Sequence, residues 1–133
     1  MRVFVDASAF ISLVVVDDSN HIRAAEIAAR LELEKSELVT SSMIIAEVLT
    51  VLSMRFSKTL AVEFGARIMK GGVQIIHPST FSFEHAWQMW KEEPHKDLSF
   101  VDAMSFALIE AEHIPSAFSF DHDFLKRGFE ILH

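Results

Sequence analysis

The sequence contains no cysteine, and it has only four glycines and three prolines among 133 residues. Without cysteine the chain forms no disulfide and no thiolate zinc site, and it has no thiol nucleophile. This absence agrees with a reducing interior, so we expect a cytoplasmic protein. The few glycines form neither GxxxxGK[ST] nor GxGxxG, which disfavours folds that cradle a nucleotide phosphate in a glycine loop.

Long apolar runs are also missing, because no segment approaches the ~18 consecutive apolar residues of a membrane span. We therefore expect no membrane partner. The length fits a single domain spanning residues 1–133. Hydrophobic residues still make up 50% of the chain, and the mean hydropathy is +0.27. Such a surplus of apolar surface in a small domain predicts an interface, either a homodimer or a bound partner.

Basic charge is in short supply, with 12 Lys and Arg against 19 Asp and Glu and a net charge of −7. Broad non-specific binding of nucleic acid requires a basic face, so this balance argues against it. It does not exclude RNA that is handled through a bound metal ion. The seven histidines show no HExxH and no paired zinc spacing, and we interpret them as surface or packing residues.

Short β-favouring runs alternate with helical patterns along the whole chain. The expected strands are residues 2–5, 38–40, 73–76, 116–120 and 129–132, the last at a sheet edge. The expected helices are residues 7–14, 19–34, 42–56 with Ser42 as its cap, 59–70, 80–92, 99–113 and 122–127. This alternation predicts an α/β fold with a mainly parallel central sheet between two layers of helices.

Four acidic residues stand where such a fold would gather them. Asp6 follows the first strand, Glu47 lies inside an apolar helix, Asp102 is near a helix start, and Asp121 follows a late strand. Ligand sites in parallel sheets form outside the carboxyl ends of the strands. Carboxylates that lie close together repel one another unless a cation neutralises them, and Mg²⁺ or Mn²⁺ prefers such oxygen ligands. The pattern predicts a hard-metal site.

Each of these acids also has a structural interpretation. Asp6 and Asp121 can serve as helix N-caps, and Asp102 follows Ser99 by three residues, as in a capping box. Glu47 is harder to explain in this way, because its neighbours one helical turn away are mostly apolar and include no Lys or Arg. A partly buried carboxylate there requires a metal or a distant cation.

Four short segments carry a family resemblance: residues 5–8 (VDAS), 46–47 (AE), 97–103 (DLSFVDA) and 119–124 (SFDHDF). In their order and spacing the chain resembles the PIN-domain ribonucleases, and most closely the small VapC-like toxins of toxin–antitoxin pairs. The resemblance covers essentially the whole chain. It implies that the metal-binding, catalytic acids are Asp6, Glu47, Asp102 and Asp121, with Asp123 as an occasional helper. It also implies hydroxyl residues in the site at Ser8 and at Ser119, where the family usually has threonine.

The resemblance further implies cleavage of single-stranded or loop RNA with one or two Mg²⁺ or Mn²⁺ ions. A metal held by the acids would lower the pKa of a bound water and stabilise the charge that develops on the phosphodiester, so no His or Ser nucleophile is required. If the chain is a toxin, an antitoxin should cover the acidic cleft and reach the carboxylates with an Arg or Lys.

Other functions remain open from the sequence. A PIN-type nuclease for processing or quality control of ribosomal RNA would use the same acids, and a non-catalytic PIN-like module would bind RNA or protein without them. An aspartyl-phosphate protein also places an Asp after its first strand. That pattern fits poorly, since Ser8 replaces the second Asp of the phosphatases, and the pair Asp17 and Asp18 lies beyond the first helix.

Two further features are candidates for contacts. Phe83, Trp87 and Trp90 share one face of a helix, which suits base stacking or a partner helix, although core packing or a dimer face is the favoured interpretation. Three local pairs of basic residues could hold a phosphate backbone or simply face water: Arg55 with Lys58, Lys91 with Lys96, and Lys126 with Arg127.

Overall fold

The structure is a computed structural model that describes residues 1–128 and 130–133. Its strands form one sheet in the order β3-β2-β1-β4-β5, and every neighbouring pair is parallel. The strands are β1 (Arg2–Val5), β2 (Glu37–Ser41), β3 (Val73–Ile76), β4 (Ser116–Phe118) and β5 (Glu130–Leu132). The predicted mainly parallel α/β sheet is therefore confirmed.

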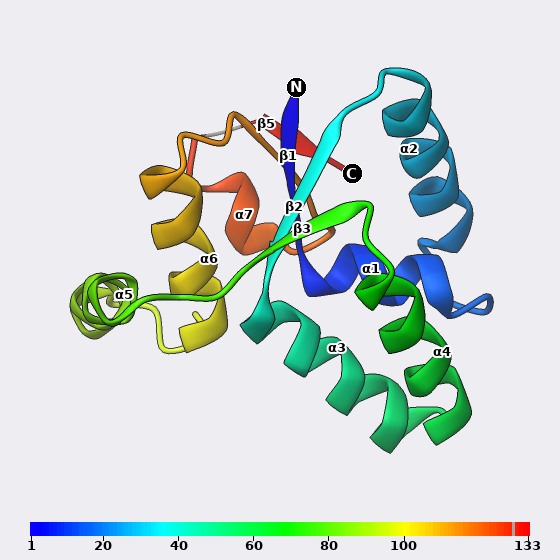
Figure 1. Cartoon of the computed structure of the whole chain (residues 1–133). Coiled ribbons are helices and arrows are strands. Elements are labelled where there is room, and N and C mark those ends of the chain that lie inside the picture. The colour runs from blue at the N-terminus through cyan, green and yellow to red at the C-terminus, as the bar shows by residue number, and fades with distance from the viewer. Residues whose placement is uncertain (129) are drawn as a thin grey trace.

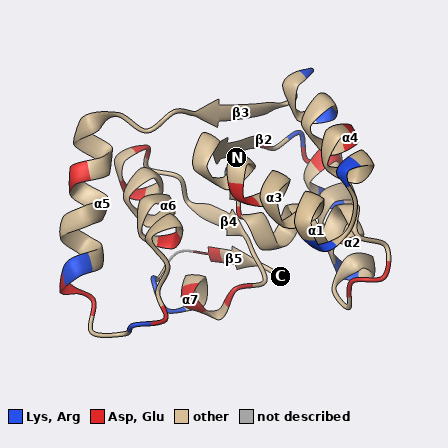
Figure 2. Cartoon of the chain, turned by 90° about the horizontal axis from the view of Figure 1, so that it is seen from below, with Lys and Arg blue, Asp and Glu red and all other residues tan. Residues whose placement is uncertain are grey.

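Helices cover both faces of this sheet. They are α1 (Ala7–Val14), α2 (His21–Leu33), α3 (Ser42–Arg55), α4 (Lys58–Met69), α5 (Thr80–Glu92), α6 (Phe100–Ala111) and α7 (His122–Leu125). Figures 1 and 2 both show helices α1 to α4 on one side of the strands and α5 to α7 on the other. This three-layer arrangement follows from parallel connections, which have to cross over a face of the sheet.

The central strands β1 and β4 are apolar along their length because both of their faces are covered. Val3, Phe4 and Val5 are at most 1% exposed, as are Ala117 and Phe118 on the neighbouring strand. Burying each of these larger side chains contributes roughly 1.5–3 kcal/mol. The two strands end side by side, with Val5 paired to Phe118. The residues that follow them, Asp6 and Ser119, therefore emerge next to each other from a rigid part of the core.

The start of α3 differs by one residue from the prediction. Ser41, rather than Ser42, is the N-cap, and its hydroxyl accepts a hydrogen bond from the backbone N–H of Ile44 at 3.2 Å. The reason is the register of the sheet, in which Ser41 still pairs with Ile76 as the last residue of β2. Ser42 is consequently the first residue inside the helix.

Strand β4 is shorter than predicted, because Ser119 makes the last backbone contact with β5 and Phe120 bonds outside the sheet. The backbone N–H of Ser119 bonds to the carbonyl oxygen of Leu132, and that of Phe120 bonds to the Ser8 hydroxyl. Helix α6 also ends earlier than predicted, since His113 adopts a φ of 52°. Of the edge strand predicted at residues 129–132, Phe129 lies outside the described residues, and Glu130–Leu132 is confirmed at the sheet edge.

The aromatic stripe of α5 is not core. Phe83 and Trp87 are 52% and 46% exposed, so the core-packing interpretation is wrong for both. Phe83 and Trp90 contact the Phe100 ring, with centroids 5.1 and 5.9 Å apart, and the Trp90 indole donates to the carbonyl oxygen of Leu98 at 2.9 Å. The stripe thus braces the start of α6. Among the described residues, no helix has the length and hydrophobicity to cross a membrane.

Candidate metal centre

A cleft of about 480 Å³ lies at the carboxyl edge of the sheet. It is lined by seven acidic side chains: Asp6, Asp18, Glu47, Asp97, Asp102, Asp121 and Asp123. The five acids considered from the sequence all lie here, and they come from the ends of β1 and β4 and from helices α3, α6 and α7. Asp18 and Asp97 are additional members that the sequence reasoning did not propose as site residues.

Asp6 is the most buried of these acids, at 3% exposed. Although it occupies the N-cap position of α1, its side chain makes no capping hydrogen bond. Instead, the hydroxyls of Ser8 and Ser119 both donate to its Oδ2 atom at 2.8 Å. Burial raises the pKa of Asp6, the two hydroxyls and the backbone of Ala7 oppose this, and the charge of Asp121 adds to the rise. The prediction of Asp6 as an N-cap is therefore confirmed for its position, although its carboxylate makes no capping hydrogen bond.

The two serine hydroxyls connect Asp6, which follows β1, to the residues that follow the neighbouring strand β4. Ser8 Oγ accepts from the backbone N–H of Phe120, and Ser119 Oγ accepts from that of Asp121, each at 3.0 Å. A serine has one O–H proton, so a hydroxyl that donates to Asp6 has none left for the 3.3 Å contact between the two serines. Ser119 thereby couples the position of the Asp6 carboxylate to that of the Asp121 backbone.

Asp121 and Asp123 lie on the short helix α7. Asp121 is its N-cap, and Oδ1 accepts from the Asp123 backbone N–H at 2.9 Å. This structural role occupies one oxygen of the carboxylate. Carboxylate oxygens of Asp102, Asp121 and Asp123 all lie within 4.8 Å of one another. Asp123, ranked below the other acids from the sequence, is thus part of the tightest acidic group.

Asp102 sits in the first turn of α6 and is 8% exposed. Its backbone N–H donates to the Ser99 hydroxyl at 3.0 Å, so the N-cap half of the predicted capping box is present. Burial raises the pKa of the Asp102 carboxyl to about 8, with further increases from the charges of Asp6, Asp121 and Glu47. The Ser99 hydroxyl opposes this shift.

Glu47 projects from α3 and is partly buried, as expected from its apolar neighbours. Burial raises the pKa of Glu47, and the charges of Asp6 and Asp121 raise it further. No Lys or Arg forms an ion pair with any of the five acids within the described part of the chain. The protein itself thus leaves the repulsion within this cluster uncompensated.

The donor set fits a divalent hard cation. Metal–oxygen distances of 2.0–2.6 Å bring ligand oxygens to within about 5 Å of each other, and the group formed by Asp102, Asp121 and Asp123 already meets this spacing. Carboxylate oxygens favour Mg²⁺, Mn²⁺ or Ca²⁺ over the softer transition metals. An acidic cluster able to hold a metal is therefore present.

Arg55 and Phe56 line the same cleft at its far end, and the sequence reasoning did not place them together with the acids. A signal for Arg55 existed, because Glu47, Val51 and Arg55 are spaced by four residues on one helix and all three line the cleft. Arg55 and Lys58, predicted from the sequence as a basic pair, line different cavities. Lys58 lines the one between α3 and α4.

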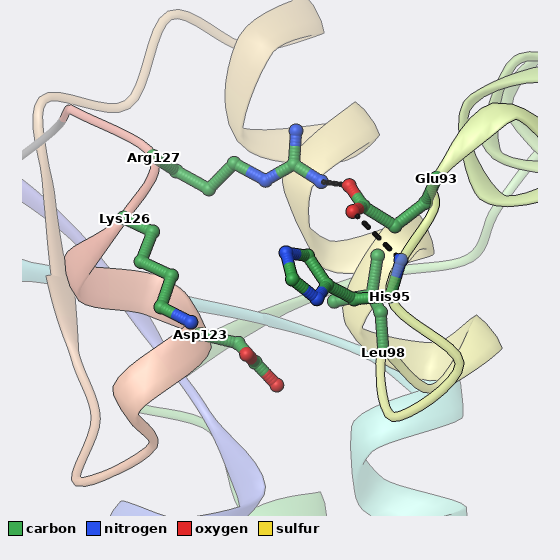
Figure 3. A pocket seen from close by; sticks show the side chains of 6 residues that line it. All are labelled: Glu93, His95, Leu98, Asp123, Lys126 and Arg127. Atoms are coloured by element: carbon green, nitrogen blue, oxygen red, sulfur yellow. Dashed lines mark hydrogen bonds and ion pairs between the residues drawn. The ribbon is translucent and has the colours of Figure 1, made fainter.

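A second cavity, of about 250 Å³, adjoins the acidic cleft and is shown in Figure 3. Its lining residues are Glu93, His95, Leu98, Asp123, Lys126 and Arg127. Arg127 donates to a Glu93 carboxylate oxygen at 3.2 Å, and its guanidinium lies 4.6 Å from the centroid of the Phe106 ring. Arg127 thus holds the α5–α6 connection, whereas Lys126 forms no ion pair within the part of the chain that the structure describes.

The PIN domain family model matches residues 3–130. The chain is 33% identical, over 96% of its length and 95% of theirs, to the proteins named 23S rRNA-specific endonuclease VapC20 from Mycobacterium tuberculosis strains CDC 1551 / Oshkosh and ATCC 25618 / H37Rv. The crystal structure of that species' VapC20, described as a Sarcin-Ricin loop cleaving toxin, matches with a TM-score of 0.85 and 31% identity, over 96% of this chain and 95% of that one. VapBC2 from Rickettsia felis, solved bound to a DNA fragment from its promoter, shares the fold at a TM-score of 0.71 with 13% identity, over 98% and 97% of the chains.

Proposed function

This chain belongs to the PIN-domain family, and from that premise we propose that it is a metal-dependent endoribonuclease and the toxin of a VapBC-type toxin–antitoxin pair. The observation that carries the proposal is the convergence of five carboxylates on one cleft, with no Lys or Arg paired to any of them among the described residues. Such a cluster is electrostatically unfavourable by itself and becomes favourable around a divalent ion.

We assign the metal ligands to Asp6, Glu47, Asp102, Asp121 and Asp123, with Mg²⁺ or Mn²⁺ as the ion. When bound, the ion supplies a water of lowered pKa as nucleophile and neutralises charge on the phosphodiester. The protein's own side chains hold the ligand carboxylates in position. Ser8 and Ser119 favour the ionised form of Asp6 and orient it, and the N-cap bond to Asp123 fixes Asp121.

The proposed substrate is a looped region of ribosomal RNA. Its support is the similarity, over 96% of this chain, to relatives whose names specify 23S rRNA and the sarcin–ricin loop. A loop also suits the cleft, because unstacked nucleotides can enter a site of this size and a regular helix cannot. Since the RNA of ribosomes is cytoplasmic, we place the reaction in the cytoplasm.

Two competing functions use the same fold. A PIN nuclease for processing ribosomal RNA would share the acids, and it differs in cutting precursor rather than mature RNA. A non-catalytic binding module is disfavoured, because such a module has no need for an uncompensated acidic cluster. The toxin proposal is preferred because the match to the named toxin extends over 96% of this chain.

Incubation of the purified protein with mature ribosomes, a sarcin–ricin loop hairpin and an unrelated unstructured RNA tests the proposal. Each RNA is exposed to Mg²⁺, Mn²⁺ or EDTA. We expect a single cut in the loop with either metal and none with EDTA. If well-folded protein cuts nothing in any metal, the binding module is the better function. Indiscriminate cutting of all three RNAs would leave a nuclease but reject the substrate class.

Ser119→Ala tests the positioning of Asp6. Removing this hydroxyl takes one hydrogen bond from Asp6 and one acceptor from the Asp121 backbone, and losses of this kind around a metal site reduce activity by about 10–100-fold. Ser119→Thr keeps the hydroxyl and is the matched control, for which we expect activity close to that of the unmodified protein. Cleavage rates at saturating and limiting Mn²⁺ distinguish weaker metal affinity from slower chemistry. Equal activity of both variants would remove Ser119 from the site.

We infer an antitoxin partner that covers the cleft and brings an Arg or Lys to the carboxylates, as the similarity to a protein described as a toxin supports. We also infer a homodimer. Its support is the exposed apolar surface of α5, where Phe81 and Phe83 are more than half exposed. Sedimentation of the isolated chain at micromolar concentration measures its mass, and a strict monomer would reject the dimer.

A further inference from the structure

We propose that a single RNA strand crosses the acidic cleft from Arg55 and Phe56 at one end to Lys126 at the other, with a base stacked on Phe56. This inference rests on the proposed nuclease function and specifies how that site holds its substrate. The acids provide the reacting centre, and the two cationic ends provide phosphate contacts on either side of it.

The first end lies two helical turns beyond Glu47 on α3, about 12 Å along the helix axis. Arg55 and Phe56 both line the acidic cleft, and Phe56 is 51% exposed. Phe56 is the residue that ends the helix, with φ −125° and ψ −87°. An exposed ring beside a guanidinium in a polar cleft matches a nucleotide, whose base stacks on the ring while its phosphate contacts the cation.

The second end is the cavity of Figure 3. Asp123 lines both this cavity and the acidic cleft, so the two adjoin at this acid of the candidate metal centre. Arg127 is held by Glu93 and by the Phe106 ring, whereas Lys126 lines the cavity and forms no ion pair among the described residues. A phosphate adjoining the reacting one would meet Lys126 directly after passing Asp123.

The two ends suit RNA as the occupant, because each offers a cation to a phosphate and one of them offers an exposed aromatic ring to a base. The protein carries a net charge of −7, and the cleft between the two ends is lined by acids. A divalent ion bound at the centre would offset part of this negative charge where the reacting phosphate lies, and Arg55 and Lys126 supply positive charge at the two ends.

Charge-neutral variants test the path: Arg55→Gln, Lys126→Gln and the double variant. Their matched controls are Lys58→Gln and Lys91→Gln, which remove exposed cations outside the two cavities. With a fluorescent sarcin–ricin loop hairpin and Mn²⁺, we expect the apparent affinity to fall about 5–20-fold for each test variant while kcat changes less than threefold. The slope of log affinity against log salt should shrink by about 0.7 for each contact removed.

Phe56→Leu and Phe56→Tyr separate stacking from simple apolar contact. We expect the leucine variant to lose about tenfold in affinity for the hairpin, and the tyrosine variant to retain it, because base–aromatic stacking depends on the ring. Binding is measured by fluorescence anisotropy as well as by cleavage, so the path is tested even if the unmodified protein cuts nothing. Absence of cutting by itself would overturn only the proposed function.

Unchanged affinity and salt slope in the double variant would overturn the path. A fall in kcat at constant affinity would do the same, since it would assign these residues to the reaction rather than to the strand. If the variants weaken capture of a co-expressed antitoxin and leave RNA affinity intact, the two ends belong to a protein interface, and the path is again wrong.

Discussion

Asp102→Asn abolishes RNA cleavage and makes the metal-free protein more stable. The substitution keeps the shape of the side chain and removes one charge from a buried acidic cluster. Removal of a principal metal ligand should reduce cleavage by about 10³-fold or more. Without metal, the same change relieves repulsion from Asp6 and Asp121, and we expect about 1–3 kcal/mol of added stability at pH 9.

The stability gain depends on pH in a defined direction. Because folding raises the pKa of the Asp102 carboxyl to about 8, the unfolded chain loses this proton near pH 4 whereas the folded chain keeps it up to about pH 8. The difference in unfolding free energy between variant and unmodified protein should therefore be small at pH 4, grow as the pH rises to 8, and be large at pH 9. Urea denaturation in EDTA at these pH values measures it.

Asp17→Asn is the matched control for this experiment, since it makes the same chemical change at an exposed position outside the cleft. We expect its unfolding free energy to stay within about 0.5 kcal/mol, and its cleavage rate within about twofold, of the unmodified protein. An Asp102→Asn protein that still cleaves RNA at a normal rate would exclude this residue as a ligand. Lower stability of the variant at pH 9 would show that a protein cation balances the carboxylate.

Without metal, the unmodified protein loses stability as the pH rises from about 5 to 9. The pKa values of Asp6, Glu47 and Asp102 are all raised on folding, chiefly by burial. The folded state therefore binds more protons than the unfolded chain. Stability from this source is complete below the unfolded values near 4 and is lost as the pH rises through the folded values, for Asp102 about 8.

Saturating Mn²⁺ or Mg²⁺ should reverse this trend. Metal binds the deprotonated carboxylates, so its stabilising effect grows with pH. At a concentration 100 times the Kd, the effect amounts to about 2.7 kcal/mol. Thermal unfolding from pH 5 to 9, in EDTA and in Mn²⁺, should give melting curves that diverge as the pH rises.

The Asp102→Asn variant is an internal check on this second experiment, because its metal-free stability should depend less on pH. Stability that increases from pH 5 to 8 in EDTA would contradict the expectation. It would mean that the acids are already paired within the folded protein and do not await a cation.

Local sequence was sufficient for much of the site. Asp6 and Asp121 were identifiable because each follows a short apolar run that forms a central strand, and the ends of parallel strands share one edge. Glu47 was identifiable because it interrupts the apolar stripe of α3 without a neighbouring cation. These inferences depend on residues within one or two turns of each acid, which is the range over which sequence periodicity is informative.

Contacts between distant segments were not accessible in this way. The Ser119 hydroxyl bonds to Asp6 across 113 residues, whereas the Asp6 side chain makes no capping hydrogen bond to the neighbouring α1. Likewise, the sequence did not distinguish the two members of the pair Arg55 with Lys58, or those of the pair Lys126 with Arg127. The fold directs Arg55 and Lys126 toward the cavities while Lys58 and Arg127 are placed elsewhere or paired.

The amino-acid sequence by itself determined the alternation of strands and helices, the parallel sheet, and the acids at its carboxyl edge, because hydrophobic periodicity and capping are local properties. Only the tertiary structure decided which oxygens approach one another, that Asp123 joins Asp102 and Asp121, and which cations face the cleft. Those features depend on strand order and helix packing, which bring together residues whose separation along the chain carries no local signal.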